Sequence, residues 1–334
     1  MLINVTVYIR KDCHLCDQII RDLNQIQKRI PHNLVLMDIE TDSTLKDQFM
    51  MEIPVVETGP YRLKYPFSKE ELEMTLAASA DRQTHLEKIG SDNYQRVRTR
   101  SENINRSDRI SYWISRHYLL IINLFVFLYF GIPFLAPVLK NAGADSSAEI
   151  IYRVYKPLCH QWGFRSWFMF GEQAYYPHEE AKIQGVLSFE EVTGVSDLDD
   201  PNRIFARNFE GNEQLGYKVA LCQRDVAIWG SILIFGIIFA LSRRRIKGLN
   251  WLLWIALGLL PVGLDGFSQV VSQLNIQIIK EFLPYRESTP FLRTITGFLF
   301  GFTTAWFGYP SVEEAMSDSR RVLSKKFAVI KSKS

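Results

Sequence analysis

The chain's paired cysteines lie in the stretch Lys11-Asp12-Cys13-His14-Leu15-Cys16-Asp17-Gln18. Before this stretch, Asn4 to Ile9 alternates apolar β-forming residues with others, which predicts a strand. After it, Asp17 to Ile30 repeats apolar residues at helical spacing. The pair therefore falls where a strand ends and a helix begins, and there the free amides and the helix dipole favour a thiolate.

Two kinds of chemistry use such a pair. In a redox pair, Cys13 occupies the more exposed position and attacks, and Cys16, one turn into the helix, resolves the mixed disulfide. A zinc site would need a second Cys/His pair at matching spacing, whereas His14 lies inside the motif and His32 stands alone. The motif therefore favours redox chemistry, or a fold descended from it, over zinc.

The following residues predict a small mixed domain. A second strand is expected over 33–39, a short helix over 44–51, and further strands over 53–58 and 61–65. The spacing of Ser68 and Glu71 matches a capping box, which predicts that a helix begins there.

This segment resembles the glutaredoxin-like branch of the thioredoxin fold. The resemblance rests on Val7-Tyr8, Cys13-His14-Leu15-Cys16, Asp38-Ile39-Glu40, Ile53-Pro54-Val55-Val56 and Ser68-Lys69-Glu70-Glu71-Leu72. It implies an α/β thioredoxin-like domain over residues 1–80, in which Pro54 is a cis-proline facing the dithiol. The Gly-Gly that glutaredoxins place near bound glutathione is absent around Tyr65-Pro66-Phe67, which leaves open whether glutathione is used.

The composition separates this domain from the rest. The net charge of +3 in 334 residues gives no indication of nucleic-acid binding. The stretch Met1-Leu2-Ile3-Asn4 lacks the basic and apolar pattern of a signal peptide, so we expect no cleaved leader and a cytosolic first domain.

Apolar runs predict an all-α membrane domain with four transmembrane helices over residues 118–310. The runs are Leu119–Leu139, Val226–Leu241 completed by Val219-Ala220-Leu221, Trp251–Val270, and Phe291–Tyr309. A basic cytoplasmic linker is expected over 81–117 and a basic cytoplasmic tail over 311–334. The lipid bilayer is then a partner of the chain.

Basic residues predict the orientation. The linker, the cluster Arg243-Arg244-Arg245-Ile246-Lys247 and the tail fall on one side of a four-span protein. By the positive-inside rule that side is the cytoplasm, which places both chain termini there in a multi-pass protein of the cell membrane. The outer side receives a long loop over 140–218 and a shorter one over 272–290; the acidic part of the first, residues 172–216, is expected to form a small subdomain or lid.

Polar residues concentrate at the outer ends of the predicted spans. The candidate site consists of Cys159, His160, Gln161, Cys222, Arg224, Asp225, Asp265, Gln269, Arg286 and Arg293. A carboxylate within a span is costly without a partner, and Arg224 and Arg293 are the expected partners of Asp265.

Three interpretations of this cluster stay open. It is a structural network of ion pairs, or it contains an outer-face disulfide between Cys159 and Cys222. Alternatively it is a site for zinc or another transition metal, with Cys159, His160, Cys222 and Asp225 as ligands.

The same half of the chain resembles a family of prokaryotic predicted membrane proteins of unknown function. The resemblance extends over residues 152–308 and rests on Cys159-His160-Gln161, Arg165-Ser166, Cys222-x-Arg224, Asp265-Gly266-x-x-Gln269, Arg286-x-Ser288, Arg293 and Gly297. The family pattern continues Cys-x-Arg with a second cysteine, where this chain has Asp225. A three-cysteine site or a Cys-x-x-Cys pair in the membrane half is therefore excluded.

Two functions follow as hypotheses. The first is a membrane-bound thiol–disulfide protein that acts on cytosolic thiol or disulfide partners through Cys13 and Cys16. The second is a binding or transport module for a metal or small polar ligand at the outer cluster, with the redox domain as its regulator. A quinone-linked disulfide oxidoreductase is a third, which the missing Cys-x-x-Cys in the spans disfavours. The sequence does not specify an oligomeric state.

Overall fold

The computed structural model describes residues 2–41, 43–90, 103–196, 199–274 and 285–332. The chain divides into two compact units. The first unit contains residues 1–118 and 314–334, and the second contains residues 119–313. Residues 91–102 of the expected linker and 275–284 of the shorter outer loop lie outside the described residues.

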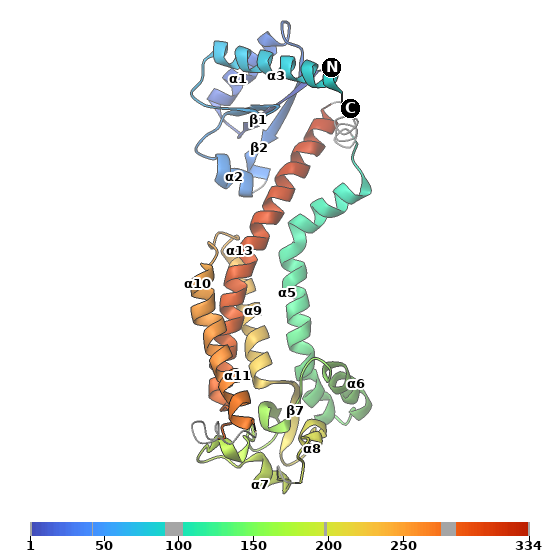
Figure 1. The fold of residues 1–334 in the computed structure, drawn as a ribbon. Helices are drawn as coiled ribbons and strands as arrows, with labels where there is room; N and C mark the ends of the chain where they lie inside the picture. Colours follow the sequence, from blue (N-terminus) through green and yellow to red (C-terminus); the bar gives the residue numbers. More distant parts are fainter. Residues whose placement is uncertain (1, 42, 91–102, 197–198, 275–284, 333–334) are drawn as a thin grey trace. The chain divides into compact units, whose positions relative to one another are not determined.

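The first unit contains a four-stranded sheet with strand order β2-β1-β3-β4 (Figure 1). Strand β1 pairs in parallel with β2 and antiparallel with β3, and β3 pairs antiparallel with β4. Its elements are β1 (Ile3–Ile9), α1 (His14–Ile26), β2 (His32–Asp38), η1 (Ile39–Thr41), α2 (Ser43–Phe49), β3 (Val55–Thr58), β4 (Tyr61–Lys64) and α3 (Lys69–Ile89). Helix α3 thus continues past residue 80, and its capping box between Ser68 and Glu71 forms as expected.

Two apolar layers enclose this sheet, because successive residues of a strand point to opposite faces. Val5 and Val7 of β1 pack with α1 and α3 on one face. Tyr8 packs with Phe49 of α2 on the other face, where their rings stack with centroids 4.3 Å apart. This is the mixed, thioredoxin-like arrangement that the sequence predicts (Figure 1).

The C-terminal part of α13 (Pro290–Lys331) belongs to the first unit from residue 314 onward. Ala328 and Val329 pack against the α2 layer. Lys325 Nζ donates to Glu57 Oε2 over 2.8 Å, and the Tyr8 hydroxyl donates to the same oxygen over 3.0 Å. The expected basic tail is therefore a helix that covers part of this domain's α2 face.

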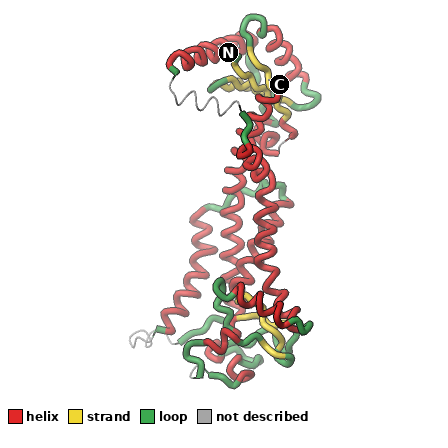
Figure 2. The backbone as a smooth tube through the Cα atoms, turned by 90° about the vertical axis from the view of Figure 1, so that its right-hand side faces the viewer, coloured by secondary structure: helices red, strands yellow, loops and turns green. Residues whose placement is uncertain are grey.

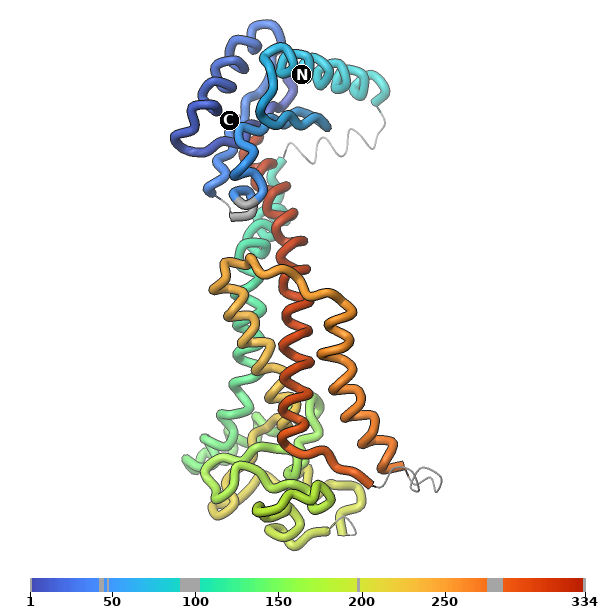
Figure 3. The backbone as a smooth tube through the Cα atoms, turned by 90° about the vertical axis from the view of Figure 1, so that its left-hand side faces the viewer, coloured from blue at the N-terminus to red at the C-terminus, as the bar shows by residue number. Residues whose placement is uncertain are grey.

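The second unit contains helices that run alternately up and down. Its elements include α5 (Arg106–Asn141, which begins in the first unit), α9 (Gln223–Leu241), α10 (Trp251–Trp254), the π-helical turn η4 (Ile255–Leu259), α11 (Leu260–Gln273) and the start of α13. Helices α9 and α13 are parallel, and α5 and α10–α11 oppose them; Figure 3 shows α9, α13 and α10–α11 side by side. The contacts that fix these directions are Gly297–Arg224 and Phe239–Tyr309 (α13 and α9), Tyr129–Trp229 and Asn123–Gly236 (α5 and α9), and Trp254–Phe307 and Gly258–Thr303 (α10–η4 and α13).

Three of the described helices are long and apolar enough to cross a membrane: α5, α9 and the helix over Trp251–Gln273. The fourth expected span, Phe291–Tyr309, is helical within α13 but is not among these three. Arg293 and several Thr and Gly residues lower its hydropathy. Its crossing of a membrane stays a prediction.

The segment between α5 and α9, residues 142–222, is called the outer segment after its expected position. It corrects the all-α expectation, because it contains a three-stranded sheet with order β5-β7-β6 (Figure 2). Its elements are α6 (Asp145–Tyr155), η2 (Gly163–Arg165), β5 (Ser166–Met169), η3 (Glu179–Ala181), α7 (Phe189–Thr193), α8 (Ile204–Asn208), β6 (Gly211–Asn212) and β7 (Gly216–Cys222). Val219-Ala220-Leu221 lies in β7 rather than in the second span. Strand β7 pairs with β5, and all three residues of the run are buried. A short, continuously apolar run lacks the alternating pattern of a half-buried strand, so its sequence does not distinguish a strand from a helix.

Candidate functional site

The first candidate site is the cysteine pair at the start of α1. Cys13 and Cys16 form a disulfide in this structure. Cys13 is the N-cap residue of α1, and its Sγ accepts a hydrogen bond from the backbone N–H of Cys16 over 3.2 Å. Cys16 is buried, whereas Cys13 is partly exposed. Cys13 is thus the more exposed of the two cysteines, as the sequence predicts.

Pro54 immediately precedes β3 in the same domain. The Ile53–Pro54 peptide bond is cis, as the resemblance to glutaredoxins implies, and Pro54 is buried. The adjoining residues Val55 and Val56 are buried on opposite faces of the sheet. Pro54 is thus held in the core of the domain.

The second candidate site joins the outer segment to α9. Cys159 and Cys222 are free, and Cys159 Sγ accepts a hydrogen bond from the Cys222 backbone N–H over 3.3 Å. The two sulfur atoms and one carboxylate oxygen of Asp225 all lie within 4.8 Å of one another. The side-chain interaction with the Cys222 thiol, together with burial, raises the pKa of the Cys159 thiol. Two thiols and a carboxylate are ligands that zinc accepts, and three protein ligands leave a fourth position open.

His160 does not join this group, which corrects the expected ligand set. Its side chain is exposed and lies against Trp162, with ring centroids 4.9 Å apart. The chain turns at Gln161, which has a φ of 54°. The buried Gln161 amide donates to the Tyr152 and Ala220 carbonyl oxygens. Gln161 therefore orders the loop, and His160 packs on Trp162 instead of joining the three donors.

Asp265 of α11 lies in a buried network with charged groups from α9 and from the segment before α13. It accepts hydrogen bonds from Arg224, from Arg286 over 2.7 Å and from Ser288 over 2.8 Å. Arg224 is thus a partner, as expected. Arg293 is not, which corrects that part of the prediction.

Arg293 pairs with Glu287, which the sequence reasoning did not select. The Glu287 carboxylate also accepts two hydrogen bonds from Arg165 over 2.7 and 2.9 Å, and one from the Gln269 amide. Burial acts to raise the pKa of Glu287, but Arg165 and Arg293 hold it below its ordinary value. The outer network therefore has two centres, Asp265 and Glu287.

The network includes residues that were missed as site members, among them Glu287, Arg165 and Ser288. A signal was present for Arg165 and Ser288, because both belong to the motifs that resemble the membrane-protein family. Glu287 lies between Arg286 and Ser288 in one of those motifs, but a carboxylate in a loop has no distinctive pattern. Only the fold shows that it faces inward, with 5% of the residue exposed.

Comparisons with known proteins agree with both halves. Residues 4–77 match the family model described as Glutaredoxin-like domain (DUF836), and residues 212–307 match the one described as Predicted membrane protein (DUF2085). The chain is 26% identical over 206 residues to an uncharacterized protein of Methanocaldococcus jannaschii, which covers 59% of this chain and 93% of that protein. No solved structure matches the chain. The chain therefore combines a glutaredoxin-like domain at its N-terminal end with a domain of a predicted membrane-protein family at its C-terminal end.

Proposed function

We propose that the protein is a membrane-anchored thiol–disulfide oxidoreductase that works through Cys13 and Cys16. The observation that carries this proposal is the disulfide at the N-terminus of α1, with Cys13 the more exposed cysteine. In the reduced domain, the Cys16 amide and the helix dipole stabilise a thiolate at Cys13. Thioredoxin-like domains use such a cysteine as the attacking group.

The reaction transfers two electrons from the dithiol to a partner's disulfide. The Cys13 thiolate attacks one partner sulfur, which breaks the partner's S–S bond, forms a mixed disulfide and releases one partner thiolate. Cys16 then loses its proton and attacks Cys13 Sγ, which releases the second partner thiol. The products are the Cys13–Cys16 disulfide and a reduced partner, and the reverse sequence oxidises a dithiol partner.

The membrane domain serves as the anchor and crosses the bilayer four times in this proposal. Residues 106–118 and 314–332 pack in one unit, so they lie on the same side of any membrane that the intervening helices cross. A chain that starts and ends on the same side of a membrane crosses it an even number of times. With α5, α9 and α10–α11 as three crossings, α13 is the fourth, and its close packing on α9 supports a position within the membrane. By the positive-inside rule, the basic residues on this side favour a cytosolic position for it and for the dithiol. A cysteine-reactive reagent that cannot cross membranes should therefore label Cys13 only after the cells are opened.

Alkylation and trapping test the redox proposal. Near neutral pH, the reduced full-length protein should be alkylated at Cys13 before Cys16, because the thiolate population is larger at Cys13. The Cys16→Ser variant should accumulate a mixed disulfide with a disulfide-bonded probe peptide, and the matched Cys13→Ser variant should not. Equal and slow alkylation of both cysteines would leave the domain with the fold but without the activity.

A second candidate function is a metal-binding module at Cys159, Cys222 and Asp225, regulated by the redox domain. The approach of three donor atoms to within 4.8 Å favours it, and a soft divalent metal such as zinc suits two thiols and a carboxylate.

Metal content separates this function from a purely structural cluster. The purified protein, loaded with zinc and desalted, should retain about one equivalent, and Asp225→Ala should lose most of it. The His160→Ala variant is the matched control and should keep its zinc, because His160 packs on Trp162 and is not one of the three donors. Equal zinc retention in the Asp225→Ala variant would contradict this function.

A further inference from the structure

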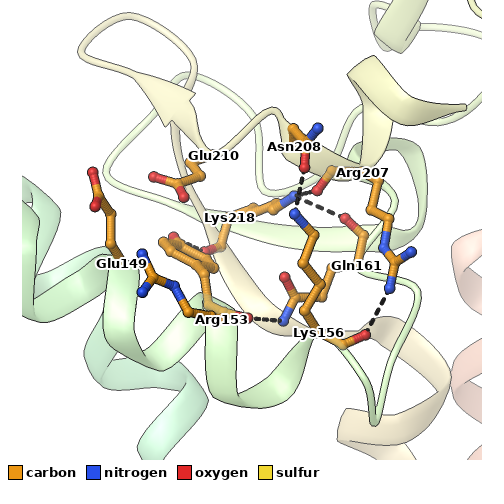
Figure 4. A pocket seen from close by; sticks show the side chains of 9 residues that line it. Glu149, Arg153, Lys156, Gln161, Arg207, Asn208, Glu210 and Lys218 are labelled. Atoms are coloured by element: carbon orange, nitrogen blue, oxygen red, sulfur yellow. Dashed lines mark hydrogen bonds between the residues drawn. The ribbon is translucent and has the colours of Figure 1, made fainter.

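A polar cavity of about 230 Å³ lies in the outer segment, separate from the dithiol and from the three metal-donor atoms (Figure 4). Helix α6, the loop after it, α8 and β7 supply its walls. Its charged lining consists of Arg153, Lys156, Arg207, Lys218, Glu149 and Glu210. The volume suits a small ion and is below that of a pocket for a drug-sized molecule.

The charge of the cavity is predominantly positive. Four of its lining side chains are basic and two are acidic. The Glu210 carboxylate is already paired with Lys140, over 2.8 Å. Glu149 is thus the acidic group that remains for a ligand. Figure 4 shows Glu149 and Glu210 on one side of the cavity, opposite Lys156 and Arg207.

Two guanidinium groups that line the cavity have N–H groups without an acceptor among the described residues. Arg153 makes no hydrogen bond or ion pair with any residue that the structure describes. Arg207 donates from one Nη to the Lys156 carbonyl oxygen over 2.8 Å, but its buried Nε has no acceptor among the described residues. Buried donors are normally satisfied, and an unsatisfied one costs about 1–3 kcal/mol. An anion in the cavity would supply the acceptors.

Buried hydrogen bonds of Lys218 hold the wall of the cavity behind these groups. Lys218 is 1% exposed, and its Nζ donates to the Gln161 carbonyl oxygen over 2.8 Å and to the Arg207 carbonyl oxygen over 2.7 Å. The Tyr152 hydroxyl donates to the Lys218 carbonyl oxygen over 2.6 Å. The amine of Lys218 thus joins the loop after α6 to the end of α8, which holds Arg207 at the cavity.

We propose that this cavity binds free hydrogenphosphate, an anion that carries two negative charges and one P–OH hydrogen at neutral pH. Arg153, Lys156 and Arg207 donate to the phosphate oxygens. Glu149 is acceptor-only when ionised, so it accepts the hydrogen of the P–OH group. Sulfate has the same shape and charge but no hydrogen at neutral pH, and its oxygens face the Glu149 carboxylate without a hydrogen bond. The site therefore prefers phosphate to sulfate.

Calorimetric titration of the full-length protein in detergent tests the site, with inorganic phosphate and sulfate as probes at equal ionic strength. Phosphate should bind at one site, and sulfate at least about tenfold more weakly. Arg153→Gln should weaken phosphate binding at least about tenfold through the loss of a charge-assisted donor. Lys182→Gln is the matched control, since it removes a positive charge from an exposed position of the same segment and should leave the affinity unchanged.

Glu149→Gln supplies the independent test of specificity. Its amide donates a hydrogen bond, so the variant should bind sulfate as well as it binds phosphate. Titration with glycerol phosphate is a second probe of the P–OH hydrogen: at about pH 7.5 this monoester is a dianion without that hydrogen, so it should bind as weakly as sulfate. The proposal is overturned if inorganic phosphate does not bind at millimolar concentration. It is equally overturned if Arg153→Gln binds phosphate as the unaltered protein does.

Discussion

Replacing Glu287 by Gln removes one negative charge from the most enclosed part of the outer network and keeps the size of the side chain. The Glu287 side chain is 2% exposed and that of Arg293 4%. Arg165, its other guanidinium partner, is 18% exposed. In the variant, both guanidinium groups face a neutral amide, and one carboxylate acceptor becomes an NH₂ donor.

The loss of stability depends on whether Arg293 and Arg165 can reach water once the carboxylate is gone. Arg293 cannot reach water, so its charge is left uncompensated, and breaking a buried pair in this way costs about 3–5 kcal/mol. Arg165 also stacks on Trp162, with its guanidinium carbon 4.4 Å from the ring centroid, and retains that contact. For a unit of this size, about 1 kcal/mol lowers Tm by about 2–4 °C, so we expect a decrease of about 6–20 °C.

Thermal unfolding in detergent, followed by tryptophan fluorescence, measures this decrease. Glu213→Gln is the matched control, because Glu213 is exposed on the same outer segment and should change Tm by no more than about 1 °C. In the double variant Glu287→Gln/Arg293→Met, part of the lost stability should return, since the unpaired charge is gone. A Glu287→Gln protein with an unchanged Tm would refute the inference that this ion pair holds the outer helix ends together.

Three further outcomes are expected. Burial lowers the pKa of Lys218 to about 7 in the folded protein, whereas a Lys in the unfolded chain keeps its proton up to about pH 10. The unfolded chain therefore binds more protons between these two values, so Tm should rise from about pH 7 to about pH 10. The Lys218→Met variant should lack this rise. Lys325→Met removes the ion pair with Glu57 and should destabilise the first unit by about 1 kcal/mol, seen as faster hydrogen exchange in β3 of the full chain. Gly301→Val should lower Tm more than Gly308→Val, because a Cβ at 301 meets the Ile228 carbonyl oxygen on α9, whereas none of the described atoms lies near a Cβ at 308.

The first domain could be derived from sequence because its signals are local. A strand, a cysteine pair and an amphipathic helix follow one another within Asn4 to Ile30, and each is specified by its own residues. Helix bounds shifted by a few residues: α1 begins at His14 because Cys13 itself serves as the N-cap. Because Cys13 precedes the helix as its N-cap and Cys16 lies within the first turn, Cys13 is the more exposed of the two.

The outer cluster was only partly derivable, because its geometry depends on loops. Cys159 and Cys222 meet because β7 delivers Cys222 beside the turn that follows α6, and no sequence pattern specifies that pairing. His160 adjoins Cys159 in the sequence and has a ring nitrogen that zinc accepts, but its ring packs on Trp162 rather than beside the two sulfur atoms. Arg293 carries a charge that suits either carboxylate, and the choice of Glu287 depends on how the segment before α13 folds back.

The packing of residues 314–332 on the α2 face has a consequence for biosynthesis. A ribosome that adds about 5–20 residues per second needs about 10–45 s to proceed from the end of α3 at Ile89 to this segment. During that interval the apolar cluster against which Ala328 and Val329 pack lacks this part of its covering. The glutaredoxin-like domain therefore acquires its complete surface only after the helices of the second unit have been made, so the order in which the two parts are completed is set by the chain itself.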